Sequence, residues 1–149
     1  MCSYCGCESI EVIGRFMSEH VEIINATGDL RRATASGDAD EVRAAVAIVR
    51  GLLDPHARAE ESGLFAVLAE DVEFADHVQG LCREHVGLHG LLDQVHAGSH
   101  AVLPVFEKML RTHIDREENG LFPAAAIAFA GPEWERVATL TLQPETAGT

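Results

Sequence analysis

The chain has 149 residues, of which 47% are hydrophobic and only 5% aromatic, so it suits one helical domain with a substantial core. Its formal net charge of -13 repels phosphate backbones and excludes nucleic acid as a partner. The longest apolar run, residues 121–130, is too short to cross a bilayer, and no targeting segment is visible. We therefore expect a cytoplasmic protein without a membrane partner.

Apolar residues recur at steps of three and four in four segments, which predicts four amphipathic helices. We expect helices over residues 9–32, 39–70, 72–95 and 103–128, and a short helix over 133–140. Asp38 with Glu41 three residues later resembles a capping box for the second helix. Pro55 is expected to kink that helix just before His56, and Pro123 to bend the end of the fourth helix.

Four such helices joined by modest loops predict an all-α fold, an antiparallel up-down four-helix bundle with a short C-terminal helix. The expected organisation is a cysteine-containing N-terminal segment over residues 1–8, the bundle over 9–142, and a flexible tail over 143–149.

Polar side chains interrupt the apolar stripe of each of the four long predicted helices. A polar group in phase with leucines must be paired or ligated, because burying it alone costs about 1–3 kcal/mol. The residues concerned are five histidines and two glutamates: His20, His56, Glu60, His85, His89, His113 and Glu117.

The chain also repeats itself. EHVEI at residues 19–23 matches EHVGL at 84–88, and HARAEESGLF at 56–65 matches HIDREENGLF at 113–122. The sequence therefore predicts two helical hairpins of the same design. The repeat is broken where His89 follows His85 by four residues, because the first hairpin has Ile24 at that position.

These spacings are suitable for a pair of metal ions. Residues four apart lie on one helical face, with Cβ atoms roughly 5–6 Å apart. Five imidazoles and two carboxylates are too many ligands for one tetrahedral zinc, and suit two five- or six-coordinate ions with a bridging solvent oxygen. This ligand chemistry favours iron, although manganese or zinc could occupy the site. The alternative is a structural bundle that binds no metal.

The repeated blocks resemble the hemerythrin-like, or HHE cation-binding, family over residues 19–123. The resemblance implies a di-iron centre with an oxo or hydroxo bridge. It also implies a division of the ligands: His85, His89 and His113 on one iron, His20 and His56 on the other, and Glu60 and Glu117 bridging.

One ligand departs from the family's oxygen carriers, which place Asp five residues after the last histidine. Here Glu117 lies four residues and Glu118 five residues after His113. We prefer Glu117, because it repeats the spacing of Glu60. Glu61 and Glu118 are then expected to orient ligands, or to serve as alternative ligands.

The resemblance implies dioxygen chemistry. The iron with two histidines would keep an open position for O2, peroxide or nitric oxide, and the weakly charged ligand set favours a carrier or sensor. A sensor would need a protein partner. Alternative functions are an enzyme that decomposes hydrogen peroxide or handles nitric oxide, and an iron donor in iron–sulfur cluster repair. The expected pocket walls are apolar: Phe16, Ile24, Leu53, Leu64, Leu88, Leu92 and Phe122.

Three of the four cysteines, Cys2, Cys5 and Cys7, fall within the first seven residues, unlike the even spread of a disulfide-stapled secreted domain. They could form a further metal site, a redox switch or an electron relay, or could have no specific role, and the sequence leaves these alternatives open. Cys82 is expected to be a buried apolar thiol. The three remaining histidines are expected at the surface or in loops: His77, His96 and His100.

Overall fold

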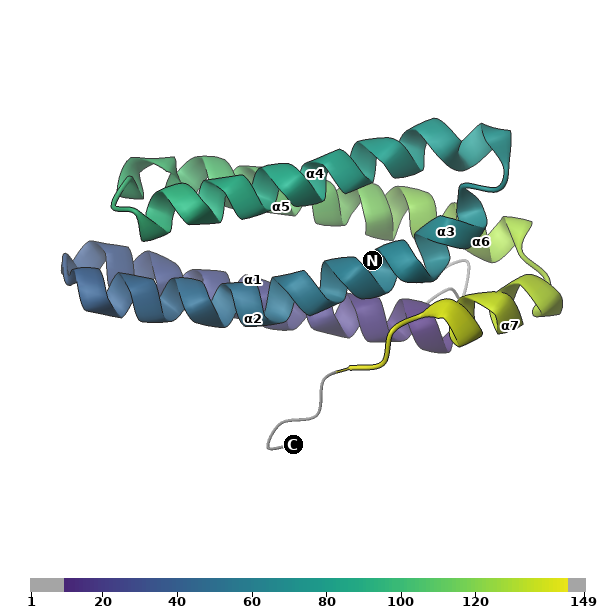
Figure 1. Cartoon of the computed structure of the whole chain (residues 1–149), viewed down its shortest axis with the longest axis horizontal. Helices are drawn as coiled ribbons and strands as arrows, with labels where there is room; N and C mark the ends of the chain where they lie inside the picture. The colour runs from purple at the N-terminus through teal and green to yellow at the C-terminus, as the bar shows by residue number, and fades with distance from the viewer. Residues whose placement is uncertain (1–9, 145–149) are drawn as a thin grey trace.

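The computed structural model describes residues 10–144 (Figure 1). The predicted thiol site at Cys2, Cys5 and Cys7 lies outside this range, as does most of the predicted tail. Within the described range there are helices and no strand, so the all-α prediction is confirmed. The helices are α1 (Glu11–Ser36), α2 (Ala39–Ser62), α3 (Leu64–Leu68), α4 (Val72–His96), α5 (Leu103–Arg116), α6 (Phe122–Ala128) and α7 (Gly131–Leu140).

The long helices form two antiparallel hairpins, α1 with α2 and α4 with α5 (Figure 1). The hairpins stack on each other, with α2 against α4 and α1 against α5. A 3₁₀ turn over His100–Val102 leads into α5. The short helices α3, α6 and α7 lie together at one end of the bundle, where α7 contacts α3.

The second helix begins at the predicted N-cap, Asp38, but without the complete capping box. The Asp38 carboxylate accepts the backbone N–H groups of Asp40 and Glu41, as an N-cap should. The Glu41 side chain instead accepts from the Ser36 hydroxyl at 2.8 Å, so the capping box is only half formed. Helix α2 runs through Pro55 without a break, and the residue whose carbonyl loses its partner there, Gly51, is exposed to solvent.

Each hairpin loses regular α-helical geometry at or just after the glutamates of its His-x3-Glu-Glu block. Helix α2 ends at Ser62, and Gly63 has the non-helical angles φ -111° and ψ -90°. At the equivalent place in the repeat, α5 passes into a π-helical turn over Glu117–Leu121. Such turns are frequent at functional sites, because the extra residue changes the direction of the side chains around it. The helix predicted over 39–70 is therefore interrupted at Gly63, whereas the one predicted over 103–128 stays helical but changes to π-helical geometry over Glu117–Leu121.

The core consists of two apolar clusters separated by a polar layer about one helical turn thick. On α1, Met17 belongs to the cluster next to α7, Ile23 belongs to the other cluster, and the buried His20 lies between them. The same order recurs on α4, where buried His85 separates Leu81 from Leu88. The polar layer therefore crosses the interior of the bundle.

None of the helices within residues 10–144 combines the length and the apolar character that a membrane span requires. The cytoplasmic location expected from the sequence stays a prediction.

The repeat offers a matched test of the packing at the end of the bundle where α3, α6 and α7 lie together. A Cβ atom on Gly63 would lie 2.0 Å from Thr141 Oγ1 and 3.0 Å from Thr141 Cα, whereas one on Gly120, its repeat equivalent, would meet nothing within 4 Å. We expect Gly63→Ala to destabilise the protein by about 1–3 kcal/mol, because backbone must move. Gly120→Ala should stay within about 0.5 kcal/mol of the wild type. Urea unfolding measures both, and equal effects would contradict the packing.

Candidate metal centre

Six side chains converge in the polar layer, and none is more than 3% exposed. They come from α1, α2, α4, α5 and the π-helical turn that follows α5. They form two groups of four that share both glutamates, and within each group the ligand atoms lie within 4.8 Å of one another. One group is His20, His56, Glu60 and Glu117, and the other is Glu60, His85, His113 and Glu117. We call these groups the first and second half-site.

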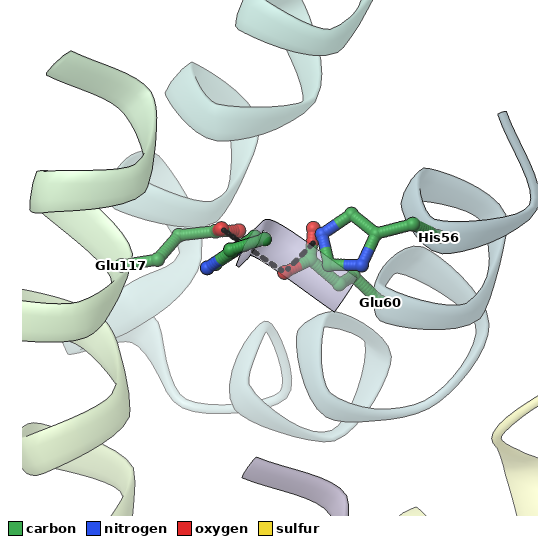
Figure 2. A group of neighbouring side chains, drawn as sticks. His56, Glu60 and Glu117 are labelled. Atoms are coloured by element: carbon green, nitrogen blue, oxygen red, sulfur yellow. Dashed lines mark ion pairs between the residues drawn. The ribbon is translucent and has the colours of Figure 1, made fainter. Parts of the chain in front are cut away.

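Glu60 lies between the two half-sites. Its Oε2 atom is 3.3 Å from His56 Nε2 in the first half-site, and its Oε1 atom is 3.1 Å from His85 Nε2 in the second. Figure 2 shows Glu60 and His56 entering the centre together, opposite Glu117. The carboxylate therefore directs one oxygen towards each half-site.

Glu117 does the same from the other hairpin. Its Oε1 atom is 2.9 Å from His20 Nε2, and its Oε2 atom is 3.4 Å from His113 Nε2. Two carboxylates that each face both half-sites, with four Nε2 atoms around them, form an arrangement that could hold two ions with both glutamates shared.

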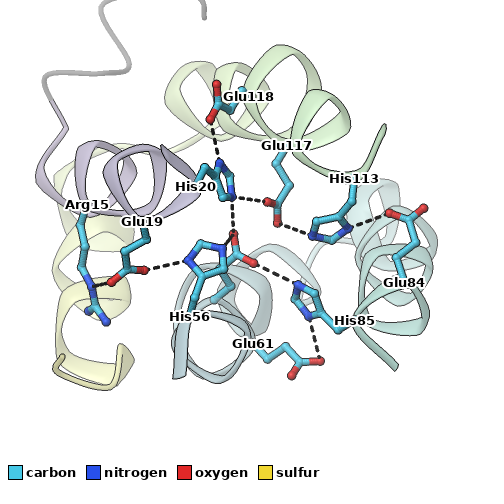
Figure 3. Close-up of polar contacts among 11 residues, drawn as sticks. Arg15, Glu19, His20, His56, Glu61, Glu84, His85, His113, Glu117 and Glu118 are labelled. Carbon is cyan, nitrogen blue, oxygen red and sulfur yellow. Dashed lines mark hydrogen bonds and ion pairs between the residues drawn. The ribbon is translucent and has the colours of Figure 1, made fainter. Parts of the chain in front are cut away.

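An outer ring of four glutamates contacts the Nδ1 atoms of the same imidazoles (Figure 3). The Nδ1···O distances are 2.7 Å for His20 with Glu118, 2.7 Å for His56 with Glu19, 2.8 Å for His113 with Glu84, and 3.6 Å for His85 with Glu61. In the three contacts of 2.7–2.8 Å the carboxylate can only accept, so Nδ1 of His20, His56 and His113 carries the proton, and the Nε2 lone pair of a neutral imidazole is left free to face the centre. The His85 contact at 3.6 Å is too long for a hydrogen bond.

The outer ring follows the internal repeat. Glu19 and Glu84 stand directly before His20 and His85 in the sequence, yet each contacts the histidine on the other helix of its own hairpin. Glu61 and Glu118 instead reach across to the other hairpin. Sequence reasoning missed Glu19 and Glu84 as site residues. The signal was the Glu-His pair that occurs in both repeated blocks.

Aromatic rings support the imidazoles with the same symmetry. Phe122 stacks on His20 with ring centroids 6.0 Å apart, and its repeat equivalent Phe65 stacks on His85 at 5.8 Å. Phe16 meets His56 edge-on at 5.5 Å. These contacts restrict the rings to the orientations in which Nε2 faces the centre.

The centre contains several buried polar atoms that lack hydrogen bonds within the described part of the chain. They are Nε2 of His20, His56 and His113, Nδ1 of His85, Oε2 of Glu60 and both carboxylate oxygens of Glu117. Buried polar groups are normally satisfied, so this concentration indicates a site that could hold a ligand. Metal ions between the Nε2 and carboxylate atoms would satisfy all of them except His85 Nδ1, and the residues present therefore fit a metal pair.

When no metal is bound, protons on the histidines offset the negative charges of the buried glutamates. Burial opposes a charge on His56, but the Glu60 and Glu19 carboxylates outweigh burial and raise its pKa to about 10. Burial would likewise raise the pKa of Glu60, but His56 and His85 hold it well below the usual value. Despite burial, the adjacent Glu117 carboxylate raises the pKa of His20 and of His113.

The metal-free protein should therefore lose stability as the pH rises from about 6.5 towards 10. His56 binds its proton more tightly in the folded state than at its ordinary pKa of 6.5, so its contribution is complete below pH 6.5 and disappears as the pH passes through 10. Glu60 contributes above its ordinary pKa of 4.5 and loses its contribution as the pH falls. Thermal unfolding of chelator-treated protein at several pH values measures this. Stability that rises from pH 6.5 to 9 would contradict it.

His89 lies outside both half-sites. Its side chain is 31% exposed, and its nearest acidic atom is Asp54 Oδ1 at 3.9 Å. Four residues along a helix turn about 40° too far to keep the direction of His85, and Leu88 and Leu92 continue the buried stripe instead. In the described geometry the histidines group two and two, whereas the prediction divided them three and two.

The first hairpin shows the same geometry. Ile24, predicted as a pocket wall, is 45% exposed, whereas Ile23 and Thr27 are buried. This prediction is wrong for the same helical reason as that for His89. The other predicted walls are buried: Phe16, Leu53, Leu64, Leu88, Leu92 and Phe122.

The remaining singled-out residues lie away from the half-sites. Cys82 is partly buried against the apolar cluster next to α7, and burial with the nearby Glu61 carboxylate raises its pKa to about 12, so it stays a thiol. His96 is exposed, and His100 is half-buried in the 3₁₀ turn. His77 is half-buried, and burial together with the Arg116 charge lowers its pKa.

A hollow of about 150 Å³ reaches His56 from the outer face of the α1–α2 hairpin, between Glu19, Glu22 and Leu52. The larger cavity, of about 460 Å³, lies between the start of α1 and α7 and includes none of the six half-site residues. The hollow therefore lies on the Glu19 side of His56 and includes no other half-site residue.

The comparison with protein families agrees with this geometry. The model of the hemerythrin HHE cation binding domain matches residues 11–125, which include all six half-site residues. No curated protein and no solved structure matches the chain. Because the match covers most of the chain, the protein belongs to the family of hemerythrin HHE cation-binding domains.

Proposed function

We propose that the protein is a non-haem di-iron protein that binds O2 or a related small oxidant, as a carrier or sensor. The observation that carries the proposal is that each buried glutamate directs one oxygen towards each half-site. The protein ligands proposed are His20 and His56 for one ion, His85 and His113 for the other, and Glu60 and Glu117 for both.

The charge around the imidazoles supports two ions. The carboxylates that contact them, and the two arginines that contact those carboxylates, leave four negative charges, which two divalent cations neutralise. The groups counted are Glu19, Glu60, Glu61, Glu84, Glu117, Glu118, Arg15 and Arg116. Nitrogen and oxygen ligands without a thiolate favour iron, and manganese or zinc would also fit.

The number of protein ligands leaves room for a small molecule. Two imidazoles and two shared carboxylates give each ion four protein ligands, whereas iron commonly takes five or six. Iron in such a site supplies reversible electron exchange and open positions for diatomic molecules. The apolar clusters on both sides of the polar layer exclude bulk water from these positions.

The test begins with metal analysis of protein purified without added metal, followed by anaerobic reduction and exposure to air. We expect about two iron ions per chain and a visible charge-transfer band that appears with air and is lost under vacuum. Near-zero iron, manganese and zinc would rule out the metal centre. Two iron ions without a reversible band would rule out oxygen carriage.

A second candidate function is the decomposition of hydrogen peroxide. It is favoured by the equality of the half-sites, because neither ion has the fuller set of protein ligands and both would offer an open position. Steady-state loss of peroxide by iron-loaded protein, compared with His113→Ala, tests this function. A rate that is no faster than that of the variant would reject it.

A further inference from the structure

An arginine stands behind two of the four imidazoles, and Figure 3 shows one of them, Arg15, beside Glu19 and His56. In the first hairpin, Glu19 accepts from Arg15 Nε at 3.0 Å with Oε2, and contacts His56 Nδ1 at 2.7 Å with Oε1. In the second hairpin, Glu84 accepts from Arg116 with Oε2, and contacts His113 Nδ1 at 2.8 Å with Oε1. Each carboxylate thus uses one oxygen for the guanidinium and the other for the imidazole.

The internal repeat does not account for the two arginines. The position equivalent to Arg15 in the second hairpin is Gly80, and the position equivalent to Arg116 in the first is Ala59. One guanidinium therefore comes from α1 and the other from α5. The same Arg–Glu–His arrangement is built twice from non-equivalent positions, which indicates that the arrangement itself is required.

These pairs lie where their charges act strongly. The side chains of Arg15, Glu19 and Glu84 are only 20–23% exposed, so water screens them less than it screens ordinary surface pairs, whereas Arg116 is 38% exposed and is screened more. The histidines that they contact are buried.

We propose that Arg15 with Glu19, and Arg116 with Glu84, are positioning pairs that set how strongly His56 and His113 donate to the bound metal. The inference rests on the proposed function in that it requires a metal centre. A carboxylate that accepts the Nδ1 proton increases electron density at Nε2 and strengthens the metal bond. A guanidinium that donates to the same carboxylate lowers the electron density of its oxygens. It therefore reduces the increase in electron density at Nε2.

The two members of a pair should therefore act in opposite directions. Glu19→Gln should weaken zinc binding by about 10- to 100-fold and raise the reduction potential of the iron-loaded protein, because a weaker donor stabilises the ferric state less. Arg15→Gln should lower the reduction potential. If both residues merely held His56 in place, both variants would shift the potential in the same direction, which would overturn the proposal.

Two controls separate contact with the imidazole from charge alone. Glu22→Gln removes a carboxylate one turn from Glu19, at the hollow beside His56. Arg58→Gln removes an exposed guanidinium two residues after His56, where it pairs with Asp54 at 3.1 Å. We expect both controls to leave the reduction potential near the wild-type value. Shifts as large as those at Glu19 and Arg15 would overturn the proposal.

The repeat also allows the arginine to be moved. A Cβ atom on Gly80 would meet the guanidinium ends of Arg116 at 3.6 Å and Arg83 at 3.8 Å, so a Cβ is accommodated there, and Arg116→Ala removes the nearer of the two. Arg116→Ala should lower the reduction potential, and Gly80→Arg in that background should restore it by rebuilding the first hairpin's arrangement. A folded double variant, verified by circular dichroism, that keeps the lowered potential would overturn the proposal.

The metal content of the wild-type protein distinguishes the two ways to fail. If the wild type binds neither zinc nor iron, the proposed function is wrong and the inference falls with it. If the wild type binds two ions and the potentials of the Glu19 and Arg15 variants are unchanged or shift together, only the positioning role is wrong.

Discussion

His113→Ala is expected to reduce the bound metal from two ions per chain to one or none, whereas His89→Ala should leave both ions bound. His113 supplies a buried Nε2 atom to the second half-site. Loss of an outer hydrogen-bond partner lowers metal affinity by roughly 10- to 100-fold. Loss of the direct ligand His113 should lower the affinity for that ion by more. Inductively coupled plasma analysis after dialysis against a weak chelator measures the content of both variants.

The two variants form a matched pair, because each removes one imidazole from a helix of the same bundle. Circular dichroism should show both folded before the metal is counted. If His89→Ala also lost an ion, the half-exposed position of His89 would not describe the metal-bound protein, and the three-and-two division implied by the family resemblance would be restored.

The central architecture could be predicted because the internal repeat carries it. Histidine inside an apolar stripe is ambiguous when it occurs once, but His20 with His85, and the two His-x3-Glu blocks, occupy matching places in two hairpins. Duplication of the pattern constrains both the helices and the faces that meet. All six residues that the structure brings together were among the seven predicted.

The error at His89 comes from the tolerance of helical spacing. Positions three and four residues from a buried residue both count as in phase, although they differ by 100° around the helix axis. The leucines at 88 and 92 already complete the buried stripe, and they leave no inward direction for His89. The repeat could not resolve this, because both equivalent positions on α1 are isoleucine, Ile23 and Ile24.

The outer ring could not be predicted from spacing because its contacts cross between helices. Glu19 adjoins His20 in the sequence but contacts His56, and Arg15 reaches the centre only through Glu19. Such contacts depend on how two helices are rotated against each other. The π-helical turn was missed for a similar reason, since no residue type within Glu117–Leu121 specifies it locally.

Glu117→Gln is expected to lower the affinity for both ions by more than about 100-fold. Glu118→Gln should lower the affinity mainly for one ion, by about 10- to 100-fold. The reason is geometric. Glu117 is fully buried and directs one oxygen towards each half-site, so its amide would remove a negative ligand from both. Glu118 contacts only Nδ1 of His20, at 2.7 Å on the outer side of that ring.

Competition with a zinc chelator gives two dissociation constants for each variant and thereby separates these expectations. Glu61→Gln is the matched control, because it is the repeat equivalent of Glu118 and lies farther from its imidazole, at 3.6 Å. It should have the smallest effect of the three, since a longer contact polarises His85 less. If Glu118→Gln removed both ions and Glu117→Gln did not, the bridging ligand would be Glu118. The π-helical turn would then have to rearrange on metal binding to bring Glu118 inward.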